Sequence, residues 1–373
     1  MIRVANTSTT APQDLHCFYI DANSHCSGSF VPGLEGSICT DSSTCGGGVC
    51  VPAWLETDFY VRLTVGQPFE WRASDADVTV FDPDEAPGGL DKLNLPLPSG
   101  RCQRDITRTC GTDNDCAPFP GGACTQSNGG TAIPPVPEDP FVGELKCIAT
   151  DVNGVPQPNN VLKGEALIET VSATIPDIDV ASYNAIGIQA TGNGTADNVL
   201  VIGGDNPEYN ACPGVLILNH FFDDADDPVP GTDDTITTDL TLVPCSEDLL
   251  RQIPGAAVAQ YLVFNEFEQR FSTSNTVKCF LEQQLCSLDH NGGTVSESQC
   301  SRSIFNVATA GTLTGQTRIT PVSNTQIPFT IPSGLLGVAI ESHHLTGTDI
   351  TRSAAFNIHF QGVRSQQDVV IIP

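Results

Sequence analysis

Fifteen cysteines are the feature that most constrains the fold of this 373-residue chain. No two of them have the C-x-x-C spacing of zinc ribbons, thioredoxin-like redox sites or haem c attachment. Cysteines spread through loops rich in Gly and Asp are typical of disulfides formed in an oxidising compartment. We therefore predict a secreted or cell-surface protein braced by disulfides. Because the number is odd, at least one cysteine is expected to stay unpaired or to bond to another chain.

Two cysteine-rich stretches share the frame C-x5-C, followed by a loop containing Gly and a further Cys. One comprises Cys39, Cys45 and Cys50, and the other comprises Cys102, Cys110, Cys116 and Cys124. They resemble the short Cys-rich modules of uncharacterised exported and cell-surface proteins of environmental bacteria. The resemblance covers these stretches alone. It implies export and a loop-rich staple, and it implies no activity.

Disulfide pairing does not follow from sequence alone, so each predicted pair is a hypothesis. We predict Cys102–Cys116 and Cys110–Cys124 within the second stretch, and Cys212–Cys245 across a pair of strands. The expected role of each stretch is to replace a missing hydrophobic core. The alternative is a knob that binds another protein.

Short β-branched runs bounded by Gly, Pro, Asn or Asp dominate the chain and predict strands. Helical patterns long enough for a βαβ fold are missing, which favours an all-β fold of antiparallel sandwiches. One short helix is predicted at Ser246–Ile253, between the capping Ser246 and Pro254. Phe280–Leu288 fits both a helical stripe and a strand with a turn. The runs that most resemble strands are Asp58–Val65, Asn198–Ile202, Gly214–Asn219, Thr235–Val243, Ala257–Phe264 and Asp368–Ile372.

Five pairs of similar segments occur in the same order in the two halves of the chain and indicate an internal duplication. The first pair is 198 residues apart and the others are 171 to 173 apart, which an insertion containing Cys102–Cys124 would explain. We therefore predict two tandem sandwich domains, 1–205 with Cys-rich insertions at 17–50 and 102–124, and 206–373. The pairs are Val65–Ser74 with Val263–Ser272, Gly143–Lys146 with Gly315–Arg318, Leu162–Ala166 with Leu335–Ala339, Tyr183–Asn184 with Phe356–Asn357, and Asp197–Ile202 with Asp368–Ile372.

The charge balance excludes some partners and suggests one ligand. With 16 Lys and Arg against 44 Asp and Glu, the net charge of −28 repels nucleic acids and anionic membranes. No apolar run is long enough for a membrane span. Met1–Thr10 lacks the apolar region of a signal peptide, so we expect the export signal to precede this numbering. Asp-rich loops supply the oxygen ligands of calcium. The densest such loop, which we predict to hold structural calcium unless it is only a solvated loop, contains Asp223, Asp224, Asp226, Asp227, Asp233 and Asp234.

Catalytic motifs are absent from the sequence, so we predict no catalytic residues and no cofactor other than calcium. The function we predict is structural or adhesive, as a filament, coat or surface-layer subunit. Its terminal strands, Ile2–Asn6 and Asp368–Ile372, would pair with a neighbouring copy. One alternative is a secreted carbohydrate- or ligand-binding module, although Trp54 and Trp71 are the only tryptophans. The other is a secreted hydrolase that uses Glu266 with Glu268, or a metal held by His343, His344 and His359.

Overall fold

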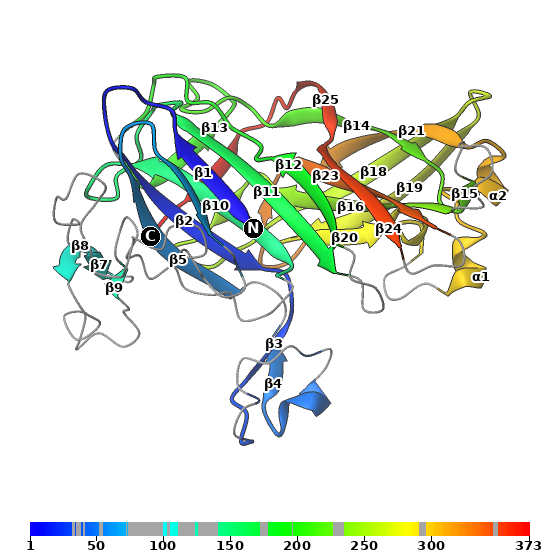
Figure 1. Ribbon diagram of the computed structural model, residues 1–373, viewed down its shortest axis with the longest axis horizontal. Coiled ribbons are helices and arrows are strands. Elements are labelled where there is room, and N and C mark those ends of the chain that lie inside the picture. Colours follow the sequence, from blue (N-terminus) through cyan, green and yellow to red (C-terminus); the bar gives the residue numbers. More distant parts are fainter. Residues whose placement is uncertain are drawn as a thin grey trace. The chain divides into compact units, whose positions relative to one another are not determined.

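A computed structural model of the chain shows a β-rich protein with only short helices (Figure 1). It describes residues 1–31, 34, 39, 42–51, 55–71, 73, 100–102, 105–110, 124–125, 141–171, 178–195, 197–226, 235–290, 296–345 and 350–373; for 100–110 and 124–125 it describes the backbone alone. No helix in the described part is long and apolar enough to cross a membrane. The prediction of an all-β protein with antiparallel sheets and disulfides is confirmed.

The chain divides into two compact units, which differ from the predicted domains 1–205 and 206–373. Unit 1 comprises Met1–Gly164 and Gln189–Leu200, and unit 2 comprises Glu165–Ile188 and Val201–Pro373. Residues 165–188 fall in unit 2 because the strand β12 (Ile178–Asn184) packs against β24 (Thr351–Asn357). The hairpin partner of β12 is β11 (Leu162–Val171), which begins in unit 1 and continues in unit 2.

Unit 1 is built on a three-stranded antiparallel sheet in the order β10-β2-β5. One face of this sheet packs against β1 and β6, which pair with each other. Leu15 and Tyr19 from β2, Phe59 from β5 and Trp71 from β6 share the core between these two layers. The strands are β1 (Ile2–Asn6), β2 (Gln13–Asp21), β5 (Leu55–Leu63), β6 (Pro68–Trp71) and β10 (Gly143–Thr150).

A disulfide joins two neighbouring strands of the β10-β2-β5 sheet of unit 1, at Cys17 on β2 and its cross-strand partner Cys147 on β10. The first cysteine-rich stretch forms a separate module around the strand pair β3 (His25–Ser27) and β4 (Val49–Val51) and the short helix η1 (Ser42–Cys45). The module contains the disulfides Cys26–Cys45 and Cys39–Cys50. The second stretch contributes the small sheet β8-β7-β9, formed by β7 (Gly100–Cys102), β8 (Asp105–Cys110) and β9 (Cys124–Thr125). The predicted pairs Cys102–Cys116 and Cys110–Cys124 lie outside the described side chains.

Unit 2 contains two sheets that enclose one large core. The first has the order β19-β18-β21-β14-β25, and the second has the order β15-β16-β23-β24, with β20 also paired to β16. Leu218 of β14, Leu240 of β16, Tyr261 of β18 and Ala339 of β23 meet in the core, so the two sheets face each other. Every second residue of β16 is buried, as expected for a strand with one face on a core. The strands are β13 (Val199–Ile202, which begins in unit 1), β14 (Pro213–Phe221), β15 (Ala225–Asp226), β16 (Thr235–Pro244), β17 (Glu247–Asp248), β18 (Gly255–Asn265), β19 (Arg270–Lys278), β20 (Leu281–Gln284), β21 (Thr314–Val322), β22 (Ile331–Pro332), β23 (Leu335–His344), β25 (His359–Val363) and β26 (Asp368–Ile371).

The helix predicted at Ser246–Ile253 is absent. Glu247 and Asp248 instead form β17, which pairs in parallel with the C-terminal strand β26. A buried polar network favours this arrangement: the Asp368 carboxylate accepts hydrogen bonds from the Ser246 hydroxyl at 2.7 Å, the Gly334 N–H at 2.8 Å and the Arg364 guanidinium. The ambiguous segment Phe280–Leu288 contains both a strand, β20, and a short helix, η3 (Leu285–Ser287).

Candidate functional site

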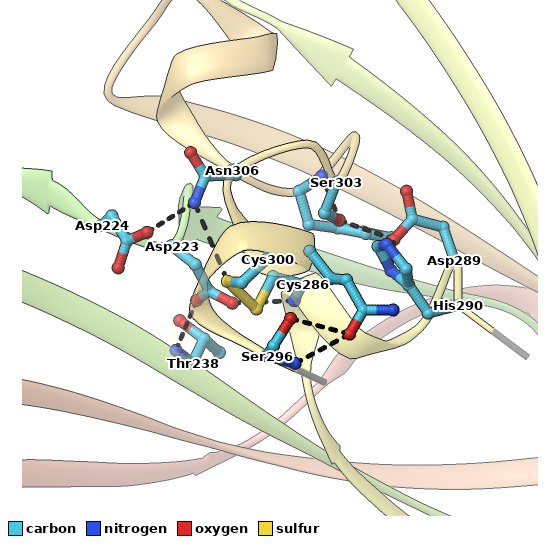
Figure 2. The surroundings of a disulfide bond; sticks show 12 residues. Asp223, Asp224, Thr238, Cys286, Asp289, His290, Ser296, Cys300, Ser303 and Asn306 are labelled. Atoms are coloured by element: carbon cyan, nitrogen blue, oxygen red, sulfur yellow. Dashed lines mark hydrogen bonds and ion pairs between the residues drawn. A yellow bond between two sulfur atoms is a disulfide. The ribbon is translucent and has the colours of Figure 1, made fainter. Parts of the chain in front are cut away.

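A group of polar side chains, several of them buried, surrounds the disulfide Cys286–Cys300 in unit 2 (Figure 2). Asp223, two residues after the end of β14, is fully buried beside this disulfide. Its Oδ1 accepts the Thr238 N–H at 2.9 Å and its Oδ2 accepts the Cys286 N–H at 2.8 Å. Burial raises the pKa of Asp223 to about 7, and these two N–H bonds oppose the rise. The carboxylate therefore connects β14, β16 and η3 within the fold.

The neighbouring Asp224 binds a different part of the same region. Its Oδ2 accepts a hydrogen bond of 2.6 Å from the Asn306 side-chain amide. The Asn306 Oδ1 accepts the Ala308 N–H at 2.9 Å, and so caps the helix α2 (Val307–Ala310). Asp224 has a φ of 62°, a conformation that Asp tolerates better than most residues. Both aspartates thus hold the chain around the disulfide.

Of the six predicted calcium ligands, the structure describes the side chains of Asp223 and Asp224 and the backbone of Asp226. Asp223 and Asp224 are hydrogen-bonded as above, and Asp226 lies on β15, paired with Thr235. Asp227, Asp233 and Asp234 lie outside the described residues. The Asp223 carboxylate and the sulfurs of Cys286 and Cys300 lie within 4.8 Å of one another, but both sulfurs belong to the disulfide and offer no thiolate to a metal. The calcium site therefore stays a prediction.

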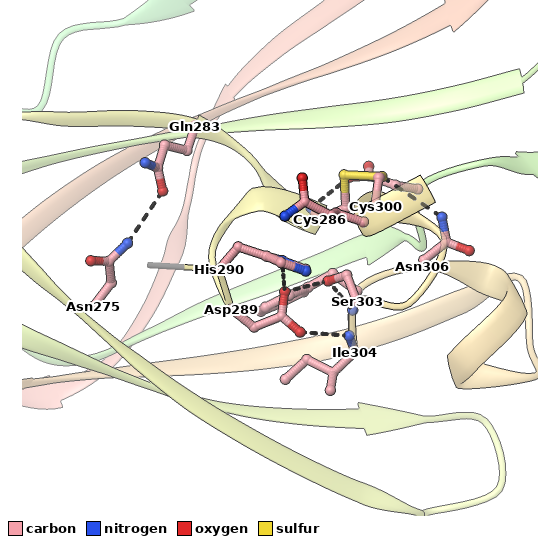
Figure 3. Close-up of polar contacts among 12 residues, drawn as sticks. Asn275, Gln283, Cys286, Asp289, His290, Cys300, Ser303, Ile304 and Asn306 are labelled. Carbon is pink, nitrogen blue, oxygen red and sulfur yellow. Dashed lines mark hydrogen bonds and ion pairs between the residues drawn. A yellow bond between two sulfur atoms is a disulfide. The ribbon is translucent and has the colours of Figure 1, made fainter. Parts of the chain in front are cut away.

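A Ser–Asp–His group next to the disulfide has the wrong order for catalysis (Figure 3). The Ser303 hydroxyl donates to Asp289 Oδ1 at 2.7 Å, and His290 Nδ1 lies 3.0 Å from the same oxygen. In a catalytic triad the imidazole lies between the carboxylate and the hydroxyl, where it can remove the hydroxyl proton. Here the carboxylate lies between the other two groups, and its Oδ2 also accepts the Ile304 N–H at 2.9 Å. The group therefore braces a loop.

The histidines considered as metal ligands do not converge. His343 and His344 are consecutive on β23 and point to opposite faces of the sheet. His343 Nε2 lies 3.0 Å from Glu341, whereas His344 Nε2 lies 2.8 Å from the Thr237 hydroxyl. His359 lies on β25, at the far edge of the other sheet. The metal site postulated for a hydrolase is thus not assembled by these three residues.

Glu266 and Glu268 both follow the end of β18, in the turn that leads to β19. Glu266 Oε1 accepts hydrogen bonds from the Thr314 N–H at 3.1 Å and the Thr314 hydroxyl at 2.7 Å. Glu268 lies in the turn between β18 and β19 with a φ of 61°. An aromatic sugar platform is not supported by Trp71, which is 1% exposed and donates a hydrogen bond to the Tyr19 hydroxyl. Trp54 lies outside the described residues.

One histidine arrangement in unit 1 was missed by sequence reasoning. His16 on β2 lies opposite Tyr60 on β5 and is fully buried. Its Nε2 is 3.0 Å from Asp58 Oδ2 and its Nδ1 is 2.9 Å from the Tyr60 hydroxyl, with the ring stacked on Tyr60. Desolvation lowers the pKa of His16, which keeps the ring neutral, while Asp58 opposes this. The only signal in the sequence was the spacing of Asp58 and Tyr60, which places both side chains on one face of a strand.

Comparisons with known proteins add no assignment: no family model, curated protein or solved structure matches the chain.

Proposed function

We propose that the protein is an extracellular or cell-surface structural protein and not an enzyme. In this proposal the chain consists of two diverged copies of one β-sandwich, and it associates with further copies of itself. The observation that carries the extracellular part is its cysteine chemistry. Of the eleven cysteines whose side chains are described, ten form five disulfides, and Cys279 is buried and outside them. Disulfides in this number persist in oxidising compartments.

The strand order of the two halves supports the duplication. In the first half, one sheet has the order β6-β1-β11-β12 and the other β5-β2-β10. The second half contains the orders β20-β16-β23-β24 and β19-β18-β21. Taken along the chain, β1, β2, β5, β6, β10, β11 and β12 correspond to β16, β18, β19, β20, β21, β23 and β24. Seven strands in the same chain order therefore have the same neighbours in both halves.

The register of pairing supports the duplication at the level of single residues. Ala166 lies opposite Tyr183 in the β11–β12 hairpin, and Ala339 lies opposite Phe356 in the β23–β24 hairpin. Both members of the second pair follow the first by 173 residues, the offset found in the sequence. A slip of one residue would exchange the two faces of a strand, so a shared register is a specific similarity.

The first of the five sequence similarities does not belong to this correspondence. Phe69 lies on β6 and pairs with Val4, whereas Phe267 lies in the turn between β18 and β19. In the strand correspondence, β6 matches β20 and not that turn. The similarity of Val65–Ser74 to Val263–Ser272 is therefore a chance match. An insertion in the first half is still required, because far more residues separate β6 from β10 (Trp71 to Gly143) than β20 from β21 (Gln284 to Thr314).

The terminal strands are already engaged within the chain, which bears on how copies would associate. Ile2–Ala5 of β1 pair with β6, and β26 pairs with β17. Neither strand can be donated to a neighbour without breaking these bonds. Self-association would therefore use another exposed strand.

Electron microscopy of native material, without and with added calcium, tests the proposal. We expect multimers, filaments or a lattice. Particles of monomer size at every protein concentration, in both conditions, would contradict the proposed self-association. Growth of the assemblies on addition of calcium would support the predicted calcium site as well.

A further inference from the structure

β25 is an exposed edge of the largest sheet in the molecule. It is the last strand in the order β19-β18-β21-β14-β25, and the described part of the chain contains no strand on its outer side. It pairs with β14 alone, from Val363 opposite Pro213 to His359 opposite Ile217. All five of its residues are exposed. An edge strand presents a row of N–H and C=O groups to which another strand can add.

The two edges of this sheet are built differently. β19, at the opposite edge, has a cationic residue at each end, Arg270 and Lys278, and the exposed positions between them are Ser or Thr. Charged residues of this kind prevent edge-to-edge association. β25 has neither Lys, carboxylate nor Pro, and it exposes 65% of Phe360 and 69% of Val363. Of the two edges of this sheet, β25 is therefore the one that combines unpaired backbone groups with exposed large apolar side chains.

The charge around β25 allows a second copy of the chain to approach. With a net charge of −28, two copies repel each other over most of their surfaces. Neither β25 nor its partner β14 contains a carboxylate. A cationic side chain lies beside the edge, since Arg318 on β21 donates a hydrogen bond to the Gln361 side chain at 2.5 Å. The edge is thus an uncharged to basic strip on a strongly acidic protein.

We propose that a second copy of this chain docks on β25, with the two β25 strands antiparallel, so that the two sheets form one continuous sheet. Two identical edges in antiparallel orientation are self-complementary, and the contact closes as a two-fold dimer. Phe360 and Val363 of each copy are buried against the other copy. β25 and β14 have no counterpart among the described strands of unit 1, whose corresponding sheet ends at β10. The site therefore belongs to the second half alone. The inference rests on the proposed self-association and specifies its surface.

Sedimentation velocity over a range of protein concentrations tests the proposal, with Phe360→Lys as the variant. The control is Phe267→Lys, because Phe267 is 72% exposed in the turn at the opposite edge of the sheet. We expect wild type and Phe267→Lys to form dimers, more strongly at high salt because salt screens the repulsion. Phe360→Lys should weaken the dimer at least tenfold. Val363→Lys repeats the test if circular dichroism shows that Phe360→Lys is misfolded.

Hydrogen exchange of the β25 amides gives a second readout. Their protection should rise with concentration in wild type, and should not rise in Phe360→Lys. If dimers form without protection of the β25 amides, or if Phe360→Lys and Phe267→Lys weaken the dimer equally, the docking site is wrong while the proposed self-association stands. If wild type is monomeric at every concentration and salt, both are wrong.

Discussion

The strand pair β2–β10 of unit 1 and the pair β18–β21 of unit 2, which correspond in the proposed duplication, are held together by different chemistry. In unit 1, Cys17 on β2 lies opposite Cys147 on β10, and the two form a disulfide. In the proposed duplication, Gly143 on β10 corresponds to Gly315 on β21, and the same offset of 172 residues relates Cys147 to Ile319. Ile319 lies opposite Tyr261 on β18, and both are buried in the core of unit 2. In the proposed correspondence, a covalent bond in unit 1 thus occupies the place of an aromatic–aliphatic contact in unit 2.

The difference teaches how a small sheet is stabilised. The sheet of unit 1 around Cys17 has three strands, whereas the sheet of unit 2 around Tyr261 also contains β14 and β25. A smaller core gains less from burial of apolar surface. A disulfide between residues 130 positions apart constrains the unfolded chain strongly. We infer that the stability of unit 1 depends mainly on the Cys17–Cys147 disulfide, whereas the stability of unit 2 depends mainly on its hydrophobic core.

Removal of the Cys17–Cys147 disulfide should have the largest effect on stability. Cys17→Ala with Cys147→Ala is expected to lower the free energy of unfolding of unit 1 by about 5 kcal/mol, because the loop it closes is long. Urea denaturation followed by Trp fluorescence measures the loss, since Trp71 lies in the core of unit 1. Cys39→Ala with Cys50→Ala is the control, because this pair closes a loop of only 11 positions in the separate module. Equal losses of free energy of unfolding in the two variants would contradict the inferred dependence of unit 1 on the Cys17–Cys147 disulfide.

A disulfide introduced at the corresponding site of unit 2 tests the register. Tyr261→Cys with Ile319→Cys should oxidise to a disulfide, because the two positions face each other as Cys17 and Cys147 do. The oxidised variant should be more stable than its reduced form by about 4 kcal/mol. Peptide mapping after proteolysis detects the new bond. Tyr261→Cys with Arg318→Cys, which are not opposite, should not form one, and a bond there would refute the register.

As the pH falls, two buried groups near β14, His220 and Asp223, should change the free energy of unfolding of unit 2 in opposite directions. Burial lowers the pKa of His220 from 6.5 to about 4, so its stabilising effect is complete above pH 6.5 and is lost as the pH falls. Between pH 6.5 and 4, wild type should lose about 3 kcal/mol relative to His220→Phe. The pKa of Asp223 is raised from 3.8 to about 7, so wild type should gain stability relative to Asp223→Asn over pH 7 to 4. Chemical denaturation at each pH measures both, and slopes of the same sign would be inconsistent with these burials.

Removal of the Tyr261 hydroxyl should have the smallest effect on stability. The Tyr261 hydroxyl is buried and has no hydrogen-bond partner in the described part of the chain. A buried polar group without a partner destabilises the fold. Tyr261→Phe should therefore raise the free energy of unfolding by up to about 1 kcal/mol, as measured by urea denaturation. Tyr19→Phe is the control in unit 1, since the Tyr19 hydroxyl accepts the Trp71 N–H, and it should lose stability.

Part of this arrangement could be predicted from sequence because it depends on local pattern. The alternation in Thr235–Val243 and the pairing Cys212–Cys245 are both present in the structure. The offset of 173 residues also identified hairpins that share a register. The helix at Ser246–Ile253 was wrong, because its capping signals are local, whereas β17 forms only through pairing with the distant β26.

The candidate site was harder to predict for the same reason. Asp223 is the first residue of an acidic run typical of solvated loops, but its bonding partners lie at Thr238 and Cys286, far along the chain. Cys17 and Cys147 are 130 residues apart and belong to no local cysteine motif. Contacts of this kind depend on the topology, which local patterns do not determine.

Mass-spectrometric mapping of disulfides in native protein, alkylated at the moment of isolation, tests the central claim most directly. The account predicts a cross-linked peptide pair containing Cys17 and Cys147, together with Cys26–Cys45, Cys39–Cys50, Cys212–Cys245 and Cys286–Cys300. Recovery of Cys17 and Cys147 as alkylated thiols, in material that is otherwise folded, would contradict both the oxidising compartment and the dependence of unit 1 on its covalent brace.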